Sequence, residues 1–477
     1  MFDLSGTAHA PAQPWTDAEK KSKGWRVLLF GVLSNFSIGI LYTWSNLKDI
    51  LEYRSVNYAS GVAKAVDAAD RLYKEWDVSQ LSLPYAVGGF ISAAIVLIAG
   101  PMQDKIGPAK VIFWGILMVG GGAILCSFVT HSPLWFTVVF TLTIGNGIGF
   151  VYACPRAAAM KWFHPSKKGL VNGLVVAGFG LGALWLAPLE IYFLKTLNWS
   201  LELTLQVLGV LILILGTIAA LNVKNPPPGY HYPEIPHDSS KPLKENMKKP
   251  ASVGMATVAK SPQAWMLFFV YAFYCSAGAM VISNASDIMR VQSGGENGPY
   301  GATVKSLLGI MVLVASLSNA TGRSLGGMLS DKIGRKPVYW IIHSVQAANM
   351  FMFHFYTTPA LIFMGVVITC VAYGTVMSTT PSLVADYWGL KAYGANYAIV
   401  YTGWGLSLMI GPNISSWSKK QVLLSGADIS TSYHFAYYAA IGLIAISAVL
   451  VYLVKKPKFK QSEIIDDYIL SPEETRA

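Results

Sequence analysis

Arg323 lies inside a long apolar stretch, an unusual place for a charged side chain. The segment from Asn319 to Lys336 reads NATGRSLGGMLSDKIGRK and ends in a charged turn that contains Asp331 and Arg335. In a helix, the eight residues from Arg323 to Asp331 span roughly 12 Å. An arginine at that depth in a bilayer is costly and is expected to serve a function. Its planar guanidinium offers paired donors, so the sequence predicts an anion site at Arg323.

Several aromatic and amide side chains are candidates for further contacts to a bound carboxylate. Tyr373 and Tyr152 can donate a hydroxyl, Tyr42 can line an apolar wall, and Asn35 can offer a polar contact. Each residue also fits ordinary packing between helices. The sequence does not separate the two roles.

Arg156 is a candidate second cation. It precedes Lys161 by five residues, or about 7.5 Å of helix. From this depth a long side chain can reach the membrane interface, which favours a structural role. If the guanidinium reaches a central cavity instead, a substrate with two carboxylates becomes acceptable.

The composition indicates a chain that lies in a bilayer. Of its 477 residues, 53% are hydrophobic and 13% are charged, against about 25% charged in typical soluble domains. The net charge of +11 falls in short segments between apolar runs, which is typical of membrane topology and not of nucleic-acid binding. Four cysteines without short spacing predict no metal site, and no cofactor motif is present.

The apolar runs predict an all-α membrane protein with twelve transmembrane helices in two pseudo-symmetric six-helix bundles. Lysine and arginine gather in alternate connections, so both termini are expected to be cytoplasmic. The twelve predicted spans are residues 24–47, 80–100, 109–130, 134–160, 168–194, 200–223, 263–289, 304–329, 337–356, 359–385, 392–416 and 432–454.

The same pattern predicts the domain organisation. An N-terminal tail (1–23) precedes the first bundle (24–223), a Pro-rich basic linker (224–262) leads to the second bundle (263–455), and a C-terminal tail (456–477) follows. Within the first bundle, residues 48–79 form a long outer loop. This loop is interpreted either as a short amphipathic helix that caps the outer mouth or as a solvated excursion.

The two halves repeat one another. The turn after the second span is matched, 227 positions later, by the turn after the eighth, and Trp162 and Trp388 repeat at a spacing of 226. In each turn, a glycine permits close helix approach while the charged residues tie the helix ends together. The predicted conformational lock consists of Gly100, Asp104, Gly107, Gly327, Asp331, Gly334 and Arg335.

The doubled G-x-x-x-D-x-x-G turn, six spans on each side of a long central loop, resembles the major facilitator superfamily over about residues 24–455. The resemblance implies two bundles that rock about a central site and so alternate access to it. It also implies that the turn residues hold the conformational lock and do not bind substrate.

Four finer segments resemble the oxalate/formate antiporter family, which is close to the monocarboxylate transporters. They are AGFGLGA (177–183), MKWF (160–163), NPPPGY (225–230) and YGANYAIVYT (393–402). The resemblance implies that the eighth-span arginine, Arg323, binds the substrate carboxylate.

Two positions depart from these families. In the oxalate-type pattern that this segment resembles, a lysine stands at the position of Trp404. Loss of that buried cation disfavours a dianion by at least a few kcal/mol. The tryptophan ring suits a carboxylate with a short carbon tail, although packing against a neighbouring helix explains it equally well. In the monocarboxylate symporters that this span resembles, a proton-binding aspartate stands at the position of Asn319. Because asparagine cannot bind the proton, the proton route is left open.

The sequence thus predicts a secondary transporter of small monocarboxylates such as lactate, pyruvate or formate, with proton symport. The alternative is an antiporter of the oxalate:formate type. We expect a monomer in the cell membrane, of the bacterial inner-membrane kind. An enzyme is not predicted, since the spans show no paired acids, histidine cluster or phosphate loop, and a transporter-like sensor normally needs an added signalling domain.

Overall fold

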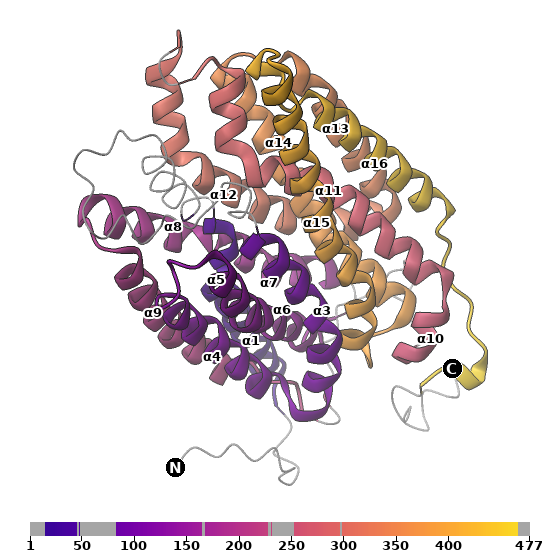
Figure 1. Cartoon of the computed structure of the whole chain (residues 1–477). Helices are drawn as coiled ribbons and strands as arrows, with labels where there is room; N and C mark the ends of the chain where they lie inside the picture. Colours follow the sequence, from indigo (N-terminus) through magenta and orange to yellow (C-terminus); the bar gives the residue numbers. More distant parts are fainter. Residues whose placement is uncertain are drawn as a thin grey trace.

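A computed structural model of the chain describes residues 15–44, 47, 83–164, 167–227, 230, 252–295 and 298–465. Within these residues the secondary structure is helical, apart from one isolated antiparallel bridge between Val253 and Ile464. Figure 1 shows the earlier helices, in indigo and magenta, beside the later ones, in orange and yellow. The all-helical prediction is confirmed.

Local sequence signals mark several helix starts. Thr16 and Glu19 form a capping box at α1, and α4 and α5 begin with Pro108 and Pro133, where a missing backbone N–H costs nothing. The first half contains α1 (Asp17–Ser37), η1 (Gly39–Thr43), α3 (Leu83–Ile106), α4 (Pro108–Cys126), α5 (Pro133–Phe140), η3 (Thr141–Gly145), α6 (Asn146–Met160), α7 (Lys168–Leu181), α8 (Ala183–Ile191), η5 (Tyr192–Thr196) and α9 (Leu201–Asn222).

The second half has longer helices. Its elements are α10 (Met255–Lys260), α11 (Pro262–Gln292), α12 (Gly301–Ile333), α13 (Arg335–Met352), η7 (Phe353–Phe355), α14 (Pro359–Trp388), α15 (Tyr393–Ser425), η8 (Ile429–Thr431), α16 (His434–Leu453) and η9 (Gln461–Glu463).

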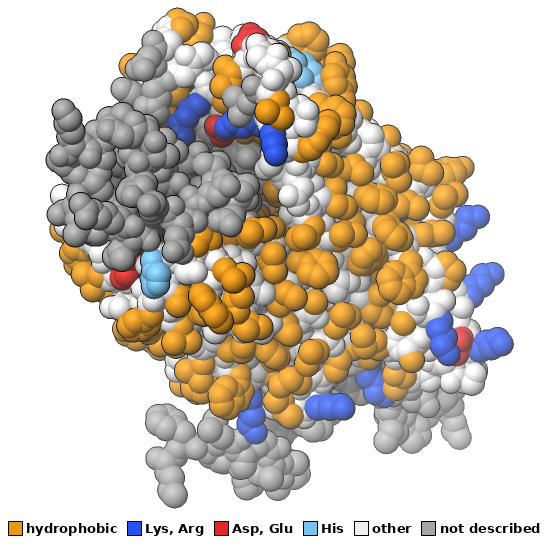
Figure 2. Space-filling model, viewed as in Figure 1, with side chains coloured by type: hydrophobic (Ala, Val, Ile, Leu, Met, Phe, Trp, Pro, Cys, Tyr) orange, Lys and Arg blue, Asp and Glu red, His pale blue; other side chains and the backbone are white. Residues whose placement is uncertain are grey.

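Over its described residues, each predicted span overlaps a helix or a run of consecutive helices. Among the described residues, eight helices are long and apolar enough to cross a membrane, or nine when the two parts of α12, which are bent by 53°, count as one span. The remaining three, α1, α13 and α15, carry more polar side chains. Figure 2 shows a broad hydrophobic surface on the side of the molecule, with most Lys and Arg at its lower and right edges, as expected of a protein surrounded by lipid.

The two halves meet along two helix pairs, α3 with α15 and α7 with α12. A Cβ atom added at Gly100 would lie 2.4 Å from the carbonyl oxygen of Gly394, and one added at Gly327 would lie 2.2 Å from that of Gly169. Gly100 and Gly327 are the first residues of the two repeated turns. The internal repeat therefore produces equivalent close crossings on both sides of the interface.

One end of the bundle carries the Asp331 turn, and we call it the motif face. Trp15 stacks on Trp162 near the end of α6, at 6.0 Å between ring centroids. At the other end of the described chain, the backbone N–H of Ile465 donates to Ser252, and Val253 donates to Trp388 at the end of α14. Both ends of the described chain thus lie on the motif face. The predicted outer loop 48–79 lies outside the described residues.

Candidate functional site

Arg323 is buried where the two halves meet. Only 1% of the residue is exposed, and each guanidinium nitrogen donates to an acceptor in the protein. Nε donates to Asn319 Oδ1 at 2.9 Å, Nη1 to the carbonyl oxygen of Val176 at 2.6 Å, and Nη2 to the hydroxyl oxygen of Tyr42 at 2.8 Å. We call these four residues the Arg323 cluster. In the described part of the chain, no acidic side chain pairs with Arg323.

The acceptors of the Arg323 cluster come from both halves. Arg323 and Asn319 belong to α12, whereas Val176 belongs to α7 and Tyr42 to η1. Two of the three hydrogen bonds therefore cross the interface between the halves. Since a guanidinium has five N–H donors, these three bonds leave donors for a bound anion.

A small cavity adjoins the Arg323 cluster. Its volume is about 10 Å³, roughly the room that one water molecule needs. Tyr42 connects the cavity to Arg323 because its ring lines the wall while its hydroxyl accepts from the guanidinium. The lining is mostly apolar and aromatic: Leu41, Tyr42, Tyr85, Phe179, Ala279, Ile282, Tyr373, Trp404 and Leu408.

Trp404 and Tyr373 form one side of this cavity. The indole N–H of Trp404 donates to the Tyr373 hydroxyl, and the indole stacks on Tyr401 at 5.1 Å. The position that departs from the oxalate-type pattern thus places an apolar ring beside the cavity. Its only polar atom is already bonded to Tyr373.

Arg156 does not reach the surface, in contrast to the expectation that it could extend to the interface. The residue is 1% exposed, and Nε, Nη1 and Nη2 are all buried without a hydrogen-bond partner among the described residues. Its Cζ lies 3.9 Å from the ring centroid of Tyr397, 4.5 Å from that of Tyr152 and 5.5 Å from that of Tyr401. We call Arg156 and these three tyrosines the Arg156 cluster.

Two other predicted residues, Tyr152 and Asn35, do not line the cavity. Tyr152 stacks on Tyr401 at 4.8 Å and meets Phe179 edge-on at 5.2 Å. Asn35, fully buried, donates from Nδ2 to the carbonyl oxygen of Val175 at 2.9 Å, which joins α1 to α7. Tyr152 therefore belongs with Arg156, and Asn35 holds the backbone next to the Val176 acceptor.

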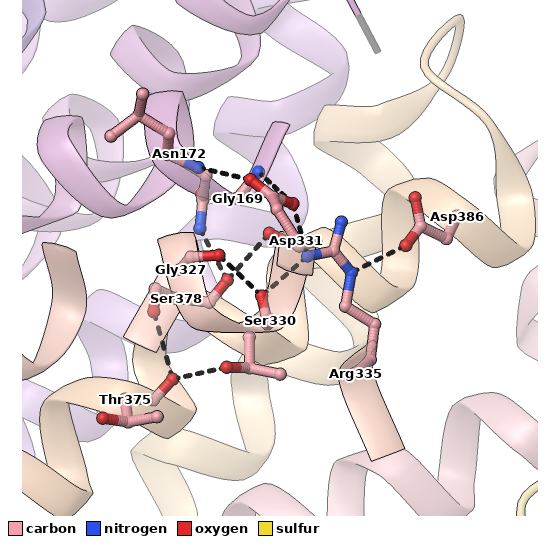
Figure 3. Close-up of polar contacts among 12 residues, drawn as sticks. Gly169, Asn172, Gly327, Ser330, Asp331, Arg335, Thr375, Ser378 and Asp386 are labelled. Carbon is pink, nitrogen blue, oxygen red and sulfur yellow. Dashed lines mark hydrogen bonds and ion pairs between the residues drawn. The ribbon is translucent and has the colours of Figure 1, made fainter. Parts of the chain in front are cut away.

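Asp331 joins the halves at the motif face (Figure 3). Its Oδ1 and Oδ2 accept from the backbone N–H groups of Gly169 and Leu170, at 3.2 and 3.0 Å. These groups open α7, where the helix dipole favours a negative charge. Nearby, the Asn172 side chain donates to the carbonyl oxygen of Ser378 at 2.9 Å. The contacts place Asp331 where a conformational lock is predicted.

Arg335 bridges two acids at this turn. Its Nη1 donates to Asp331 Oδ1 at 2.6 Å and its Nε to Asp386 Oδ2 at 2.8 Å. Asp386 belongs to α14, so this ion pair ties the end of α14 to the start of α13. Gly334 and Gly107 have φ values of +96° and +87°, which an L side chain rarely adopts. The side chain of Asp104 lies outside the described residues.

The sequence interpretation missed the tyrosines of α15. Tyr393, Tyr397, Tyr401 and Trp404 follow one another at helical spacing and form a continuous ring stack, with centroids 5.9, 5.4 and 5.1 Å apart. The i, i+4, i+8 spacing was visible in the sequence. The role of these tyrosines is recognisable only in the structure, where α6 places Arg156 against their rings.

Known proteins similar to this chain are membrane transporters. An uncharacterized transporter of Escherichia coli, YhjX, is 26% identical over 80% of this chain and 85% of its own length. The apicoplast pyruvate carrier 1 of Toxoplasma gondii is 25% identical (68% of this chain, 70% of that protein), and the oxalate:formate antiporter of Oxalobacter formigenes is 23% identical (74% and 76%).

Solved structures agree on the fold. The fucose:proton symporter FucP of Escherichia coli superposes with a TM-score of 0.56 at 14% identity, over 91% of this chain and all of that one. The family model described as Major Facilitator Superfamily matches residues 27–303 and 299–465. With its paired helix crossings and repeated turns, the chain is a member of the major facilitator superfamily, and so a multi-pass membrane transporter rather than an enzyme.

Proposed function

We propose that this transporter carries small carboxylate anions and that Arg323 binds the carboxylate. The observation that carries the proposal is a guanidinium that is 1% exposed, lies between the halves and has no acidic partner among the described residues. Such a charge is costly in a membrane unless an anion visits it. The acceptors that now hold it are neutral, so its positive charge is available to a substrate.

The cavity wall supports a short monocarboxylate such as lactate, pyruvate or formate. Phe179, Ile282 and Leu408 offer an apolar surface to a small carbon tail, and Trp404 closes the side where a second cation would be needed. The similarity to a pyruvate carrier points to the same class. We propose that the proton enters with the acid, because Asn319, which bonds Arg323, cannot titrate.

Alternating access in this proposal uses the two halves as rigid bodies. The bundles 24–223 and 263–455 rock about Arg323, with the motif face and both termini toward the cytoplasm. In the present structure the halves are joined there by Asp331 and Asn172. A carboxylate that replaces Val176 or Tyr42 at Arg323 would weaken the central joint between the halves, which links binding to movement.

Exchange of oxalate for formate is the second candidate function. It is favoured by Arg156, because a second buried guanidinium without a described hydrogen-bond partner can balance a second carboxylate. An oxalate:formate antiporter is among the similar proteins.

Uptake by the purified full-length chain in proteoliposomes tests the proposal. Labelled lactate, formate and oxalate are compared with and without an imposed pH gradient. We expect saturable lactate uptake that a proton gradient accelerates. Saturable oxalate exchange without lactate uptake would contradict the monocarboxylate proposal and favour the second candidate.

The variant Arg323→Lys keeps the positive charge but removes the planar, paired N–H donors of the guanidinium. Loss of one charge-assisted hydrogen bond, at about 1.5–3 kcal/mol, should slow uptake roughly 10- to 100-fold. Arg26→Lys is the matched control, because Arg26 is exposed and, among the described residues, its Nη2 donates to Asn222 alone, at 2.6 Å. Wild-type transport by Arg323→Lys would remove Arg323 from the site.

A further inference from the structure

The guanidinium N–H groups of Arg156 lack hydrogen-bond acceptors among the described residues. Its three nitrogens and the hydroxyl oxygen of Tyr393 are buried without hydrogen-bond partners among the described residues. Buried polar groups are almost always hydrogen-bonded, and a buried charge is tolerated only when something balances it. A guanidinium has donors and no acceptor. The group that fits beside it is therefore an anion with oxygen acceptors.

The surrounding rings attract the guanidinium but accept no hydrogen bond from its N–H groups. Three tyrosine faces lie within 5.5 Å of Cζ, and each attracts the cation through its π electrons. Tyr397 is itself held, because its hydroxyl lies 3.2 Å from that of Tyr271. The N–H donors are thus fixed in position and still free to bond an anion, which is how a preorganised site is built.

The Arg156 cluster adjoins the Arg323 cluster through aromatic contacts. Tyr152 packs on Arg156 and meets Phe179, whose ring lies 5.8 Å from Cζ of Arg323. On the other side, Tyr401 stacks on Trp404, which lines the cavity. The two clusters are therefore neighbours, separated by aromatic rings.

The halves supply the two clusters in opposite ways. In the Arg156 cluster, the arginine comes from α6 of the first half, and Tyr397 and Tyr401 come from α15 of the second. In the Arg323 cluster, the arginine comes from the second half, and its acceptors Val176 and Tyr42 come from the first. An anion bound to both arginines would contact both halves. Two cations without an acid match a dianion in charge.

We propose that Arg156 is a second anion-binding group, which holds one carboxylate of a small dicarboxylate while Arg323 holds the other. The inference rests on the proposed function, since it needs Arg323 as the first carboxylate site. It widens the substrate class from monocarboxylates to dicarboxylates with a short spacer. Trp404 and Tyr152 then line the spacer.

The test measures competition in proteoliposomes that contain the full-length chain. Uptake of a labelled monocarboxylate is inhibited by oxalate, malonate or succinate, each compared with a monocarboxylate of equal length, namely glyoxylate, propionate or butyrate. In the wild type at least one dicarboxylate should inhibit more strongly than its partner. Arg156→Gln should raise the half-inhibiting concentration of that dicarboxylate at least 10-fold and that of its partner less than 3-fold, while Arg26→Gln changes neither.

Two outcomes overturn the inference: no dicarboxylate inhibits the wild type better than its partner, or Arg156→Gln weakens both inhibitors equally. The first needs no variant, so it holds even if Arg156→Gln fails to fold. Arg156→Lys, which keeps the charge, should restore part of the dicarboxylate preference. Failure of the proposed function looks different, because monocarboxylate uptake would then be absent or indifferent to Arg323→Lys.

Discussion

Arg323 and Arg156 are alike in burial and opposite in bonding. Each is 1% exposed, each lies where the halves meet, and neither pairs with an acid in the described part of the chain. All three nitrogens of Arg323 donate to protein acceptors, whereas those of Arg156 have none among the described residues and rest against tyrosine rings.

The difference shows that burial alone does not define the role of an intramembrane arginine; its acceptors do. Val176 and Tyr42 accept from two of the guanidinium nitrogens of Arg323, so a carboxylate that uses those donors must replace the protein acceptors. At Arg156 nothing in the described chain competes. In the proposals above, Arg323 is thus both a binding group and a joint between halves, while Arg156 is a binding group only.

The largest expected effect comes from giving Arg323 an acidic neighbour. In Asn319→Asp, the new carboxylate replaces the amide oxygen that now accepts from Nε at 2.9 Å. When ionised it neutralises Arg323 and competes with the substrate, so affinity should fall about 100-fold, equivalent to about 3 kcal/mol. As the pH falls through the pKa of the new acid, protonation removes the competing charge and affinity should recover.

The pH dependence of KM for uptake measures this effect. The wild type should lack that step, because an amide does not titrate. Asn413→Asp is the control: Asn413 is exposed, and its side chain donates to the carbonyl oxygen of Met409, far from Arg323 in the sequence. If Asn319→Asp keeps wild-type affinity at high pH, the substrate does not bind at Arg323.

The second prediction separates the two clusters by moving one helix. A Cβ atom added at Gly173 would lie 2.4 Å from the backbone oxygen of Arg323, so Gly173→Ala must push α7 away from α12. Val176, one turn further along α7, should then lose its bond to Arg323. We expect a loss of about 2–3 kcal/mol in stability and slower uptake.

Thermal unfolding in detergent and initial uptake rates check the Gly173→Ala result. Gly121→Ala is the matched control, because nothing lies within 4 Å of its added Cβ. Dicarboxylate preference, which depends on Arg156, should survive in whatever transport remains. An unchanged melting temperature would mean that the α7–α12 crossing is not as close as described.

A third prediction removes the competitor at Arg323. Tyr42→Phe deletes the hydroxyl that accepts from Nη2 at 2.8 Å. Stability without substrate should fall by about 2 kcal/mol, because a buried charged donor loses its partner. The substrate should bind several-fold more tightly, because the freed donor is available to its carboxylate. Tyr85→Phe, at the same cavity, should change neither; weaker binding by Tyr42→Phe would make Tyr42 a substrate contact instead.

The architecture and the deep position of Arg323 were predictable from the sequence for physical reasons. Apolar runs of about the length of a membrane span indicate that the chain crosses a bilayer. The repeated glycine turn indicates a helix crossing too close for any side chain, as the contact of Gly327 with Gly169 shows. Arg323 was found because depth along its own helix is a local property. Asn319 bonds Arg323 and Trp404 lines the adjoining cavity, at the places that helical spacing and family resemblance led us to expect; their part in binding stays a prediction.

The second cluster was not readable because its parts are distant in sequence. Arg156 was judged by its distance from Lys161 along one helix, which says nothing about what covers it sideways. The cover is Tyr397 and Tyr401, more than 240 residues later in the chain. Asp386 was missed for the same reason, since its partner Arg335 lies on another helix.

The smallest predicted effect tests whether rings, rather than hydroxyls, hold Arg156. Tyr397→Phe keeps the face that lies 3.9 Å from Cζ and loses only the contact with Tyr271, so its melting temperature should stay near that of the wild type. Tyr397→Leu removes the face and should cost about 1 kcal/mol more. Phe179→Leu removes a ring 5.8 Å from Arg323 and should cost less electrostatically, because three hydrogen bonds already hold that guanidinium. If Tyr397→Phe and Tyr397→Leu are equally destabilised, the hydroxyl is the important group, and Arg156 is held by a polar contact as Arg323 is.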